Sequence, residues 1–352
     1  MKLSDLAHEL GVSTATISNA LNGKGRMTAQ LRQQICKSAK ALGYVHTPRI
    51  SSKARELMVI SEANEVSFSC EMASGITHAA WQKNAACALY DLGILQAGLG
   101  REATPAQLRP LVEQCIRQHP LPPSCIIYIS QYPRSLPGLL EGLSCPSVEV
   151  YCYDSGAKVS VNYDDQQGAY QAVSHLIESG RHTIAMISGP VTSHSASERM
   201  VGYQRALIAH GLPFHPKYVW IGEWDAATGR SLTHDLLNLD DRPDAIFAQS
   251  DTLACGALLA VHQAGLRVPE DIAIVSFDNT VLAQHAFPAL TSVDPPFREM
   301  GKAAFAQADR LIEGIPPIAS EIRIPCSLRV RESSSLFRPQ PTMANEPCAK
   351  DE

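Results

Sequence analysis

Apolar residues recur every three or four positions near the start of the chain, which is the spacing of short amphipathic helices. A first helix is predicted over "LSDLAHEL" (3–10). Ser13 is a good N-cap for a second helix, which Gly23 stops. Thr28 caps a third helix that runs to about Leu42. Three short helices with a glycine-containing turn between the first two follow the helix-turn-helix plan.

The second of these helices has two unlike faces. Ile17, Ala20 and Leu21 lie at helical spacing and are expected to point inward. The opposite face carries only short side chains, among them those of Ala15, Ser18, Asn19 and Asn22. Helix faces in contact with water usually carry long charged residues, so this face favours close contact with another molecule.

Apolar strand candidates alternate with amphipathic helical stretches along the rest of the chain. The predicted strands are 57–61, 125–130, 147–153, 183–189, 218–222, 245–249 and 272–277. The predicted helices are 71–92, 105–118, 165–179, 198–210, 227–238 and 252–264. Near-continuous apolar strands between helices indicate buried parallel sheets, and more than 270 residues of this pattern favour two lobes over one sheet. The predicted fold is an all-α helix-turn-helix headpiece followed by an α/β two-lobe core.

The composition divides the chain further. We expect a headpiece over 1–45, a polar linker over 46–56, the core over 57–336 and a Pro-rich disordered tail over 337–352. No apolar run approaches the roughly 18 residues that span a bilayer. The polar, acidic start does not read as a signal peptide. The 10 cysteines form no C-x-x-C pair, which favours free thiols in a reducing cytoplasm over a redox or metal site.

Charge is distributed unevenly along the chain. Residues 1–55 carry nine Lys or Arg and two Asp or Glu, a net charge of +7, whereas the remainder carries −12. A basic N-terminal segment followed by an acidic remainder indicates that only the N-terminal segment binds a polyanion. A basic face in contact with water is the alternative, and charge by itself does not decide between the two.

The sequence lacks the common catalytic and nucleotide-binding motifs. It has no G-x-S-x-G elbow, Walker A loop, H-E-x-x-H or G-x-G-x-x-G. The paired carboxylates Asp164–Asp165 and Asp240–Asp241 are predicted to cap helices or lie in turns. The 12 histidines are dispersed without the spacing of metal ligands. We therefore expect no enzymatic activity, no cofactor and no metal site.

The second helix fits the major groove of double-stranded DNA, which admits a helix whose exposed face is small and hydrogen-bonding. The predicted DNA-binding residues are Ser4, Ser13, Thr14, Ala15, Thr16, Ser18, Asn19 and Asn22. Of these, Thr14, Ala15 and Asn19 are expected to reach base edges. Thr16 and Ser18 are among those expected to donate to phosphates. A three-helix bundle that docks another protein is the alternative.

The run "KLSDLAHELGVSTATISNALNGKG", with "LGY" at 42–44, resembles the headpiece of the Lac repressor (LacI/GalR) family of bacterial transcription regulators. Later runs resemble successive blocks of that family's effector-binding core: "HLIESGRHTIAMISGP", "ERMVGYQRALIAHGLP", "AIFAQSDTLACGALLAVHQAGLRVPEDIAIVSFDNT" and "PALTSVDPP". The resemblance covers the chain from Lys2 to about Ser335. It implies a core of two lobes like a periplasmic sugar-binding protein, joined by three crossovers. It also implies a dimer or tetramer and a small-molecule effector in the cleft.

Six residues match the effector cleft of the family, and the resemblance assigns the effector to them: Phe68, Ser69, Arg199, Trp224, Ser250 and Asp278. The rings of Phe68 and Trp224 can stack on a sugar or a heterocycle. Arg199 can fork onto hydroxyls or a carboxylate, and Asp278 can accept two hydroxyl hydrogen bonds. Two other readings stay open, namely Trp224 as a core residue and Arg199–Asp278 as an ion pair across the cleft.

Several positions depart from the pattern of the family. Asn19 stands where many members have Arg, His or another groove-reading residue, and Asn prefers adenine. Ser250 replaces the usual Asn, which leaves the effector class open. Lys53 falls where a hinge-helix leucine would wedge into the minor groove, and Pro48 blocks a helix from running through the linker. The leucine-lever mechanism is therefore expected to be absent or altered.

The sequence thus predicts a cytoplasmic transcription regulator of the repressor type. A sugar or sugar derivative between the lobes is predicted to control its affinity for operator DNA, and two heads of a homodimer bind a pseudo-palindrome. Residues 337–352 lack leucine heptads, so no tetramerising coiled coil is expected there. The alternatives are a regulator with a non-sugar corepressor such as a purine, an activator, and a solute-binding protein. The headpiece argues against the last of these.

Overall fold

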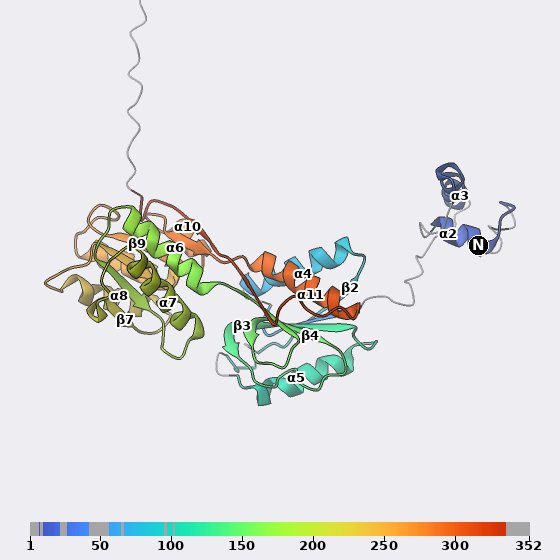
Figure 1. Cartoon of the computed structure of the whole chain (residues 1–352), viewed down its shortest axis with the longest axis horizontal. Coiled ribbons are helices and arrows are strands. Elements are labelled where there is room, and N and C mark those ends of the chain that lie inside the picture. Colours follow the sequence, from blue (N-terminus) through green and yellow to red (C-terminus); the bar gives the residue numbers. More distant parts are fainter. Residues whose placement is uncertain are drawn as a thin grey trace, which may run out of the picture. The chain divides into compact units, whose positions relative to one another are not determined.

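The computed structural model describes residues 7, 10–21, 27–41, 56–64, 67–94, 97–100 and 103–335. The chain separates into two compact units, Met1–Arg55 and Glu56–Glu352 (Figure 1). Several predictions fall outside the described residues: Ser4, Asn22, most of the first helix (3–10), the linker as far as residue 55 and the tail (337–352).

The first unit contains the two predicted helices that follow the turn, α2 (Thr14–Leu21) and α3 (Ala29–Ala41). Both begin at the expected caps. The Ser13 hydroxyl accepts a hydrogen bond from the backbone N–H of Thr16 at 3.0 Å. The Thr28 hydroxyl accepts one from that of Leu31 at 3.3 Å. A small apolar core holds the helices together through Ala7, Ile17, Ala20, Ile35 and Ala39.

The second unit contains, within its described residues, two six-stranded sheets. The sheet of the N-lobe has the order β11-β5-β4-β3-β1-β2, and all of its neighbouring strands are parallel. Its strands are β1 (Glu56–Ser61), β2 (Ala86–Asp91), β3 (Cys125–Ser135), β4 (Ser147–Tyr153), β5 (Val159–Tyr163) and β11 (Glu321–Ile324). Its helices are α4 (Ser67–Gln82), α5 (Pro105–Gln118) and α11 (Phe297–Ile312). Figure 1 shows α4 and α11 on one face of this sheet and α5 on the other.

The C-lobe repeats this plan. Its sheet has the order β12-β10-β9-β8-β6-β7, and only β12 runs antiparallel to its neighbour. The strands are β6 (Ile184–Ser188), β7 (Val219–Ile221), β8 (Ala245–Ala248), β9 (Ala273–Phe277), β10 (Thr291–Asp294) and β12 (Ser327–Arg329). The helices are α6 (Asp165–Glu178), α7 (His194–Ala209), α8 (Ala226–Leu237), α9 (Asp251–Gln263) and the short α10 (Val281–His285). The predicted fold class, two α/β lobes after a helical headpiece, is confirmed.

Burial on both faces explains why these strands are continuously apolar. In β1, Leu57 and Val59 pack into the cluster under α4 and α11. The alternate residues Met58 and Ile60 pack against α5. Parallel sheets are buried in this way because the connecting helices cover both of their faces.

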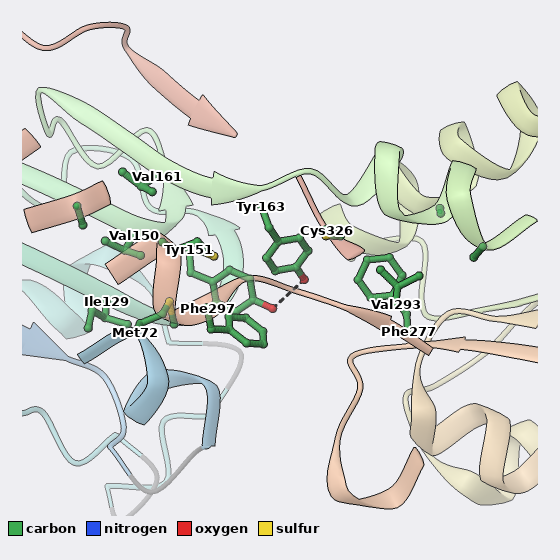
Figure 2. Packing of buried hydrophobic residues seen from close by; sticks show 14 of the residues in the cluster. Met72, Ile129, Val150, Tyr151, Val161, Tyr163, Phe277, Val293, Phe297 and Cys326 are labelled. Carbon is green, nitrogen blue, oxygen red and sulfur yellow. Dashed lines mark hydrogen bonds between the residues drawn. The ribbon is translucent and has the colours of Figure 1, made fainter. Parts of the chain in front are cut away.

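Three crossovers join the lobes, as the resemblance implies. They lie between β5 and α6, between β10 and α11, and between β11 and β12. Aromatic rings fill the space where the chain crosses. Figure 2 shows Tyr151 and Tyr163 directed toward each other, with 3.1 Å between their hydroxyls, Phe297 beside Tyr151 and Phe277 beyond Tyr163. The apolar core is therefore continuous through the junction.

One helix prediction was wrong. The helix expected over 71–92 ends at Gln82, and residues 86–91 instead form strand β2. Alanine and leucine in "ACALYD" are good helix formers, and the strand lies at the edge of the sheet. Its side chains are mostly exposed or half-buried, so it lacks the apolar run that marks the central strands.

Among the described residues, no helix is both long and apolar enough to cross a membrane.

Candidate functional site

The face of α2 that the sequence predicts to point outward is exposed in the structure. Thr14, Ala15 and Asn19 are exposed, and Ser18 is half-buried. On the opposite face Ile17 has no exposed surface, and this residue fixes the rotation of the helix. The side chains available on the open face are thus a hydroxyl, a methyl and an amide.

Two of the predicted DNA-binding residues also belong to the helix cap. The hydroxyls of Ser13 and Thr16 lie 2.8 Å apart, and the Ser13 oxygen accepts from the backbone of Thr16. Capping therefore uses the Ser13 acceptor and fixes the start of the helix.

In the core, two of the predicted effector residues, Trp224 and Asp278, lie around the guanidinium of a third, Arg199. Its Nε donates to Asp165 at 2.7 Å, and its Nη2 donates to the Tyr163 hydroxyl at 2.9 Å. Nη2 also lies 3.4 Å from a carboxylate oxygen of Asp278, and Nη1 donates to the backbone carbonyl of Gln249. Arg199 is only 3% exposed, so its planar group is held rigidly at the carboxyl ends of the C-lobe strands.

Asp278 directly follows β9 and adopts a positive φ of 104°. Its side chain remains one-third exposed. Burial raises its pKa to about 6; Arg199 opposes this shift, and the neighbouring carboxylates Asp251 and Asp165 add to it. Its charge thus changes near neutral pH.

Asp251 holds the loop after β9 in place. Its oxygens accept from the hydroxyls of Ser276 at 2.6 Å and Ser292 at 2.7 Å. They also accept from the backbone N–H and the hydroxyl of Thr280, at 2.6 and 2.8 Å. These bonds satisfy the carboxylate and explain how the strained position of Asp278 is maintained.

Trp224 packs half-buried over the end of β6. A Cβ on Gly189 would overlap its indole ring, so glycine leaves the space that the ring occupies. The guanidinium of Arg199 lies 5.9 Å from the centre of this ring. Trp224 therefore contacts the C-lobe core and also borders the Arg199 cluster.

Ser250 lies at the start of α9. It is the N-cap of α9, and its hydroxyl accepts from the backbone N–H of Leu253 at 3.2 Å. Its hydroxyl proton remains available for donation, whereas the usual Asn amide would also offer an acceptor.

The predicted N-lobe residues lie at the start of α4. The ring of Phe68 packs against Tyr151 and Phe297, with ring centres 6.0 and 5.5 Å apart. Ser69 is fully buried, and its hydroxyl has no hydrogen-bond partner. Phe68 reaches Arg199 indirectly, because the rings of Tyr151 and Phe297 both contact that of Tyr163, whose hydroxyl accepts from Arg199.

Sequence reasoning missed Tyr163, Asp165 and Gln249 as members of this cluster. Asp164 does cap α6, accepting from the backbone N–H of Gln167 at 2.9 Å. Asp165 is buried and paired with Arg199, so the capping prediction was wrong for this residue. A carboxylate directly after a strand end in "VNYDD" was the available signal.

The cluster combines a planar cation, carboxylates and aromatic faces at the carboxyl ends of parallel strands, the usual place for a ligand in an α/β sheet. Hydroxyl groups can bridge Arg199 and Asp278, and a ring can stack on Trp224. Within the described part of the chain, no group of three or more His, Cys, Asp or Glu side chains is arranged to hold a metal ion.

Comparison with known proteins places the chain among bacterial regulators. Residues 173–334 match the model of the periplasmic binding protein-like domain. The chain is 28% identical to the HTH-type transcriptional repressor PurR of Photorhabdus laumondii over 322 residues, which cover 88% of this chain and 90% of that protein.

Solved structures agree. The transcriptional regulator CelR in complex with cellobiose is 27% identical, with a TM-score of 0.64 over 95% of this chain and 99% of that one. A LacI family transcriptional regulator from Mycobacterium smegmatis is 28% identical, with a TM-score of 0.60 over 79% of this chain and 99% of that one. The chain is thus similar over most of its length to transcriptional repressors and to regulators of the LacI family.

Proposed function

We propose that this protein is a DNA-binding repressor controlled by a small polyhydroxylated effector that binds at Arg199, Asp278 and Trp224. The observation that carries the proposal is the arrangement of these three side chains. A buried guanidinium, a carboxylate that follows a strand and a large aromatic face together match the hydroxyls and the apolar face of a sugar ring.

The DNA-binding part of the proposal rests on the face of α2. Thr14, Ala15 and Asn19 would meet base edges in the major groove, with Asn19 suited to adenine. The net charge of +7 over residues 1–55 supplies the salt-dependent attraction to phosphates. We place the headpiece at 1–45, the linker at 46–56, the core at 57–336 and the tail at 337–352.

Control would work through the lobes. An effector that binds one lobe arrangement more tightly shifts the population toward it, and this arrangement sets the spacing or order of the two headpieces in a dimer. Such a regulator of bacterial genes would act in the cytoplasm.

The exposed apolar side chains supply candidate surfaces for the dimer. In the C-lobe, Val281, Leu282 and Phe287 are 68%, 50% and 88% exposed around α10. In the N-lobe, Trp81 is 77% exposed at the end of α4, and Leu89 is 45% exposed on the edge strand β2. Contiguous exposed apolar groups of this kind mark protein interfaces.

A thermal-shift screen of the full chain with neutral sugars, sugar phosphates and nucleobases tests the effector part. A ligand present at 100 times its dissociation constant stabilises the protein by about 2.7 kcal/mol. The variant Asp278→Ala should lose the shift. Asp241→Ala, which removes an exposed carboxylate paired with Lys217 at 2.9 Å, should keep it.

Binding of genomic operator fragments tests the DNA part. A chain that lacks residues 1–56 should lose operator binding while it retains the effector shift. If the truncated chain bound operator as well as the full chain does, the proposed role of the headpiece would be wrong. The direction of the effect of the ligand on operator binding separates an inducer from a corepressor such as a nucleobase, which could also stack on the ring of Trp224.

A further inference from the structure

A polar cavity lies at the junction of the lobes and adjoins the Arg199 cluster, since Tyr163 and Asp165 line it and also bond Arg199. Its wall comes from β4, β5 and β11 of the N-lobe and from the start of α7 in the C-lobe. None of the six residues assigned to the effector lines it. Three tyrosine rings and one histidine ring do: those of Tyr151, Tyr153, Tyr163 and His194.

Asn162 directs an unpaired acceptor into this cavity. The residue is 8% exposed, and its Oδ1 has no hydrogen-bond partner. The orientation of its amide is fixed by the neighbouring strand residues. Ser160 donates its only hydroxyl proton to the carbonyl of Cys152 at 2.6 Å, so its oxygen must accept from Nδ2 of Asn162, 2.8 Å away. A ligand in the cavity therefore needs a hydrogen-bond donor for Oδ1.

The hydroxyl of Tyr153 is a second polar group without a partner in this wall. Burial raises the pKa of Tyr153, so the hydroxyl keeps its proton at neutral pH. Its ring lies against that of His194, with ring centres 4.5 Å apart, and this contact joins the two lobes. The Tyr153 oxygen offers a further acceptor and the ring an aromatic face.

The charges that line the cavity favour a cation. Glu198 and Glu321 share the single guanidinium of Arg323, at 2.8 and 2.9 Å, which leaves one negative charge in excess. Asp165 adds a carboxylate whose charge is balanced by Arg199 in the wall behind it. Among the lining residues that the structure describes, Arg323 is already paired with both glutamates, and His194 is the one further group that can carry a positive charge.

We propose that this cavity binds the protonated amino group of a small primary amine. Aromatic faces attract an ammonium group, the carboxylates stabilise its charge, and its N–H groups can donate to Asn162 and Tyr153. Because both lobes line the cavity, bound amine would favour the lobe arrangement in which Tyr153 meets His194 and Arg323 meets Glu198. The amine would then be a second allosteric ligand of the regulator. Its binding would be coupled to binding of the effector because both ligands favour particular lobe arrangements.

The test uses the full chain without effector or DNA and compares methylammonium chloride with tetramethylammonium chloride at equal concentration. Both ions are cations, but only methylammonium carries N–H donors. We expect a dose-dependent rise in Tm with methylammonium alone. An equal rise with both salts would show a general ionic effect and overturn the proposal, as would no rise with either.

Variants locate the effect. Asn162→Leu removes the acceptor and should abolish the shift. Because this change also costs the bond to Ser160, Tyr153→Phe serves as a milder variant that loses only an unpartnered hydroxyl and should weaken the shift. Tyr90→Phe is its matched control, since the Tyr90 hydroxyl bonds His119 at 2.8 Å away from the cavity. An unchanged shift in both cavity variants would overturn the assignment.

A charge variant separates an ammonium site from a site for neutral donors. Glu198→Gln keeps the size of the side chain and should weaken the methylammonium shift. Its control Glu113→Gln, which removes a charge beside Arg109 on α5, should not. Methanol at the same concentration should give no shift, and an equal shift with methanol would contradict the cation requirement. Trp224→Ala should keep the methylammonium response even if it loses effector binding, so the two proposals fail independently.

Discussion

At the scale of residues, one guanidinium group bonds four residues from three separate segments of the core. Arg199 bonds Asp165 at the start of α6, Tyr163 at the end of β5, the Gln249 carbonyl after β8 and Asp278 after β9. Its charge faces two carboxylates in this cluster, and Asp251 stands behind them. The cluster therefore contains more carboxylates than cations. Asp278 lies farther from the guanidinium than Asp165 does, and its ionisation determines how the site responds to pH.

Asp278 makes that response measurable. Its pKa of about 6 lies above the ordinary Asp value of about 3.9, so the folded protein holds this proton more tightly than the unfolded chain does. Ionised Asp278 thus costs stability above pH 6, and the cost disappears as the pH falls from 6 toward 4. Allowing for its partial exposure, Asp278→Asn should stabilise the protein by about 1 kcal/mol at pH 7.5.

Urea unfolding at several pH values checks this expectation. The difference between wild type and Asp278→Asn should shrink steadily from pH 7.5 to pH 4. A difference that stayed constant, or grew at low pH, would show that another group carries the shift. Effector affinity should fall over the same range, because protonated Asp278 accepts hydrogen bonds less well.

Gly189 sets the place of the Trp224 ring. A methyl group at this position would overlap the indole, so Gly189→Ala should displace the ring. We expect the affinity for the effector to fall roughly tenfold, about 1.4 kcal/mol, measured by titration calorimetry. The far-UV circular dichroism should stay unchanged, and affinity equal to that of wild type would show that Trp224 does not stack on the ligand.

At the scale of elements, α2 depends on its cap because it is only 8 residues long. So short a helix is marginal by itself, and the Ser13–Thr16 hydrogen bond satisfies one of its free N–H groups. The buried side chains of Ile17 and Ala20 then hold it against α3. Cap and packing together fix which side chains face outward.

The variant Ser13→Ala should destabilise this helix by about 1 kcal/mol. Limited proteolysis should cut the headpiece faster, and operator affinity should fall. Ser13→Asp keeps an acceptor for the cap but places a negative charge near phosphates, so it should resist the protease while it still binds DNA poorly. If Ser13→Ala were cut no faster than wild type, the cap would not limit the stability of the helix.

The elements themselves differ in how well the sequence predicts them. The strand expected over 147–153 is observed with the same bounds, because every residue from Ser147 to Cys152 is buried. By contrast, β11 ("EIRI") and β12 ("SLR") are short edge strands with alternating exposure, and no pattern marks them. The two strands exist because the chain returns to each lobe near its end, which is a property of the fold and not of the local sequence.

The residues of the candidate effector site are likewise only partly predictable from the sequence. Arg199, Trp224 and Asp278 follow from the resemblance to the family, and the structure brings them together. Tyr163 and Asp165 join them because α6 and α7 pack side by side, so that Arg199 reaches the first turn of α6. A spacing of 34 residues between Asp165 and Arg199 contains no sign of that contact.

At the scale of the whole molecule, the apolar surface of the C-lobe predicts association. Phe287 is 88% exposed beside α10, a large cost for a single chain in water. Phe287→Asp should convert a dimer to a monomer in sedimentation equilibrium and lower operator affinity by at least tenfold, because two linked heads bind far more tightly than one. Ile208→Asp, at a site on α7 that is 73% exposed, should leave the dimer intact.

The position of Arg199 also limits how a protein with this two-lobe fold could acquire a new effector specificity. Any substitution at this residue removes the proposed ligand contact and, at the same time, the hydrogen bonds to Tyr163 and Asp165 beside a crossover. Recognition of a different effector therefore has to be engineered, or to evolve, at positions that serve the ligand without also joining the lobes. Trp224 and Ser250, each held within the C-lobe, are such positions, and a library that varies them while it retains Arg199 should contain far more folded proteins than one that varies all three.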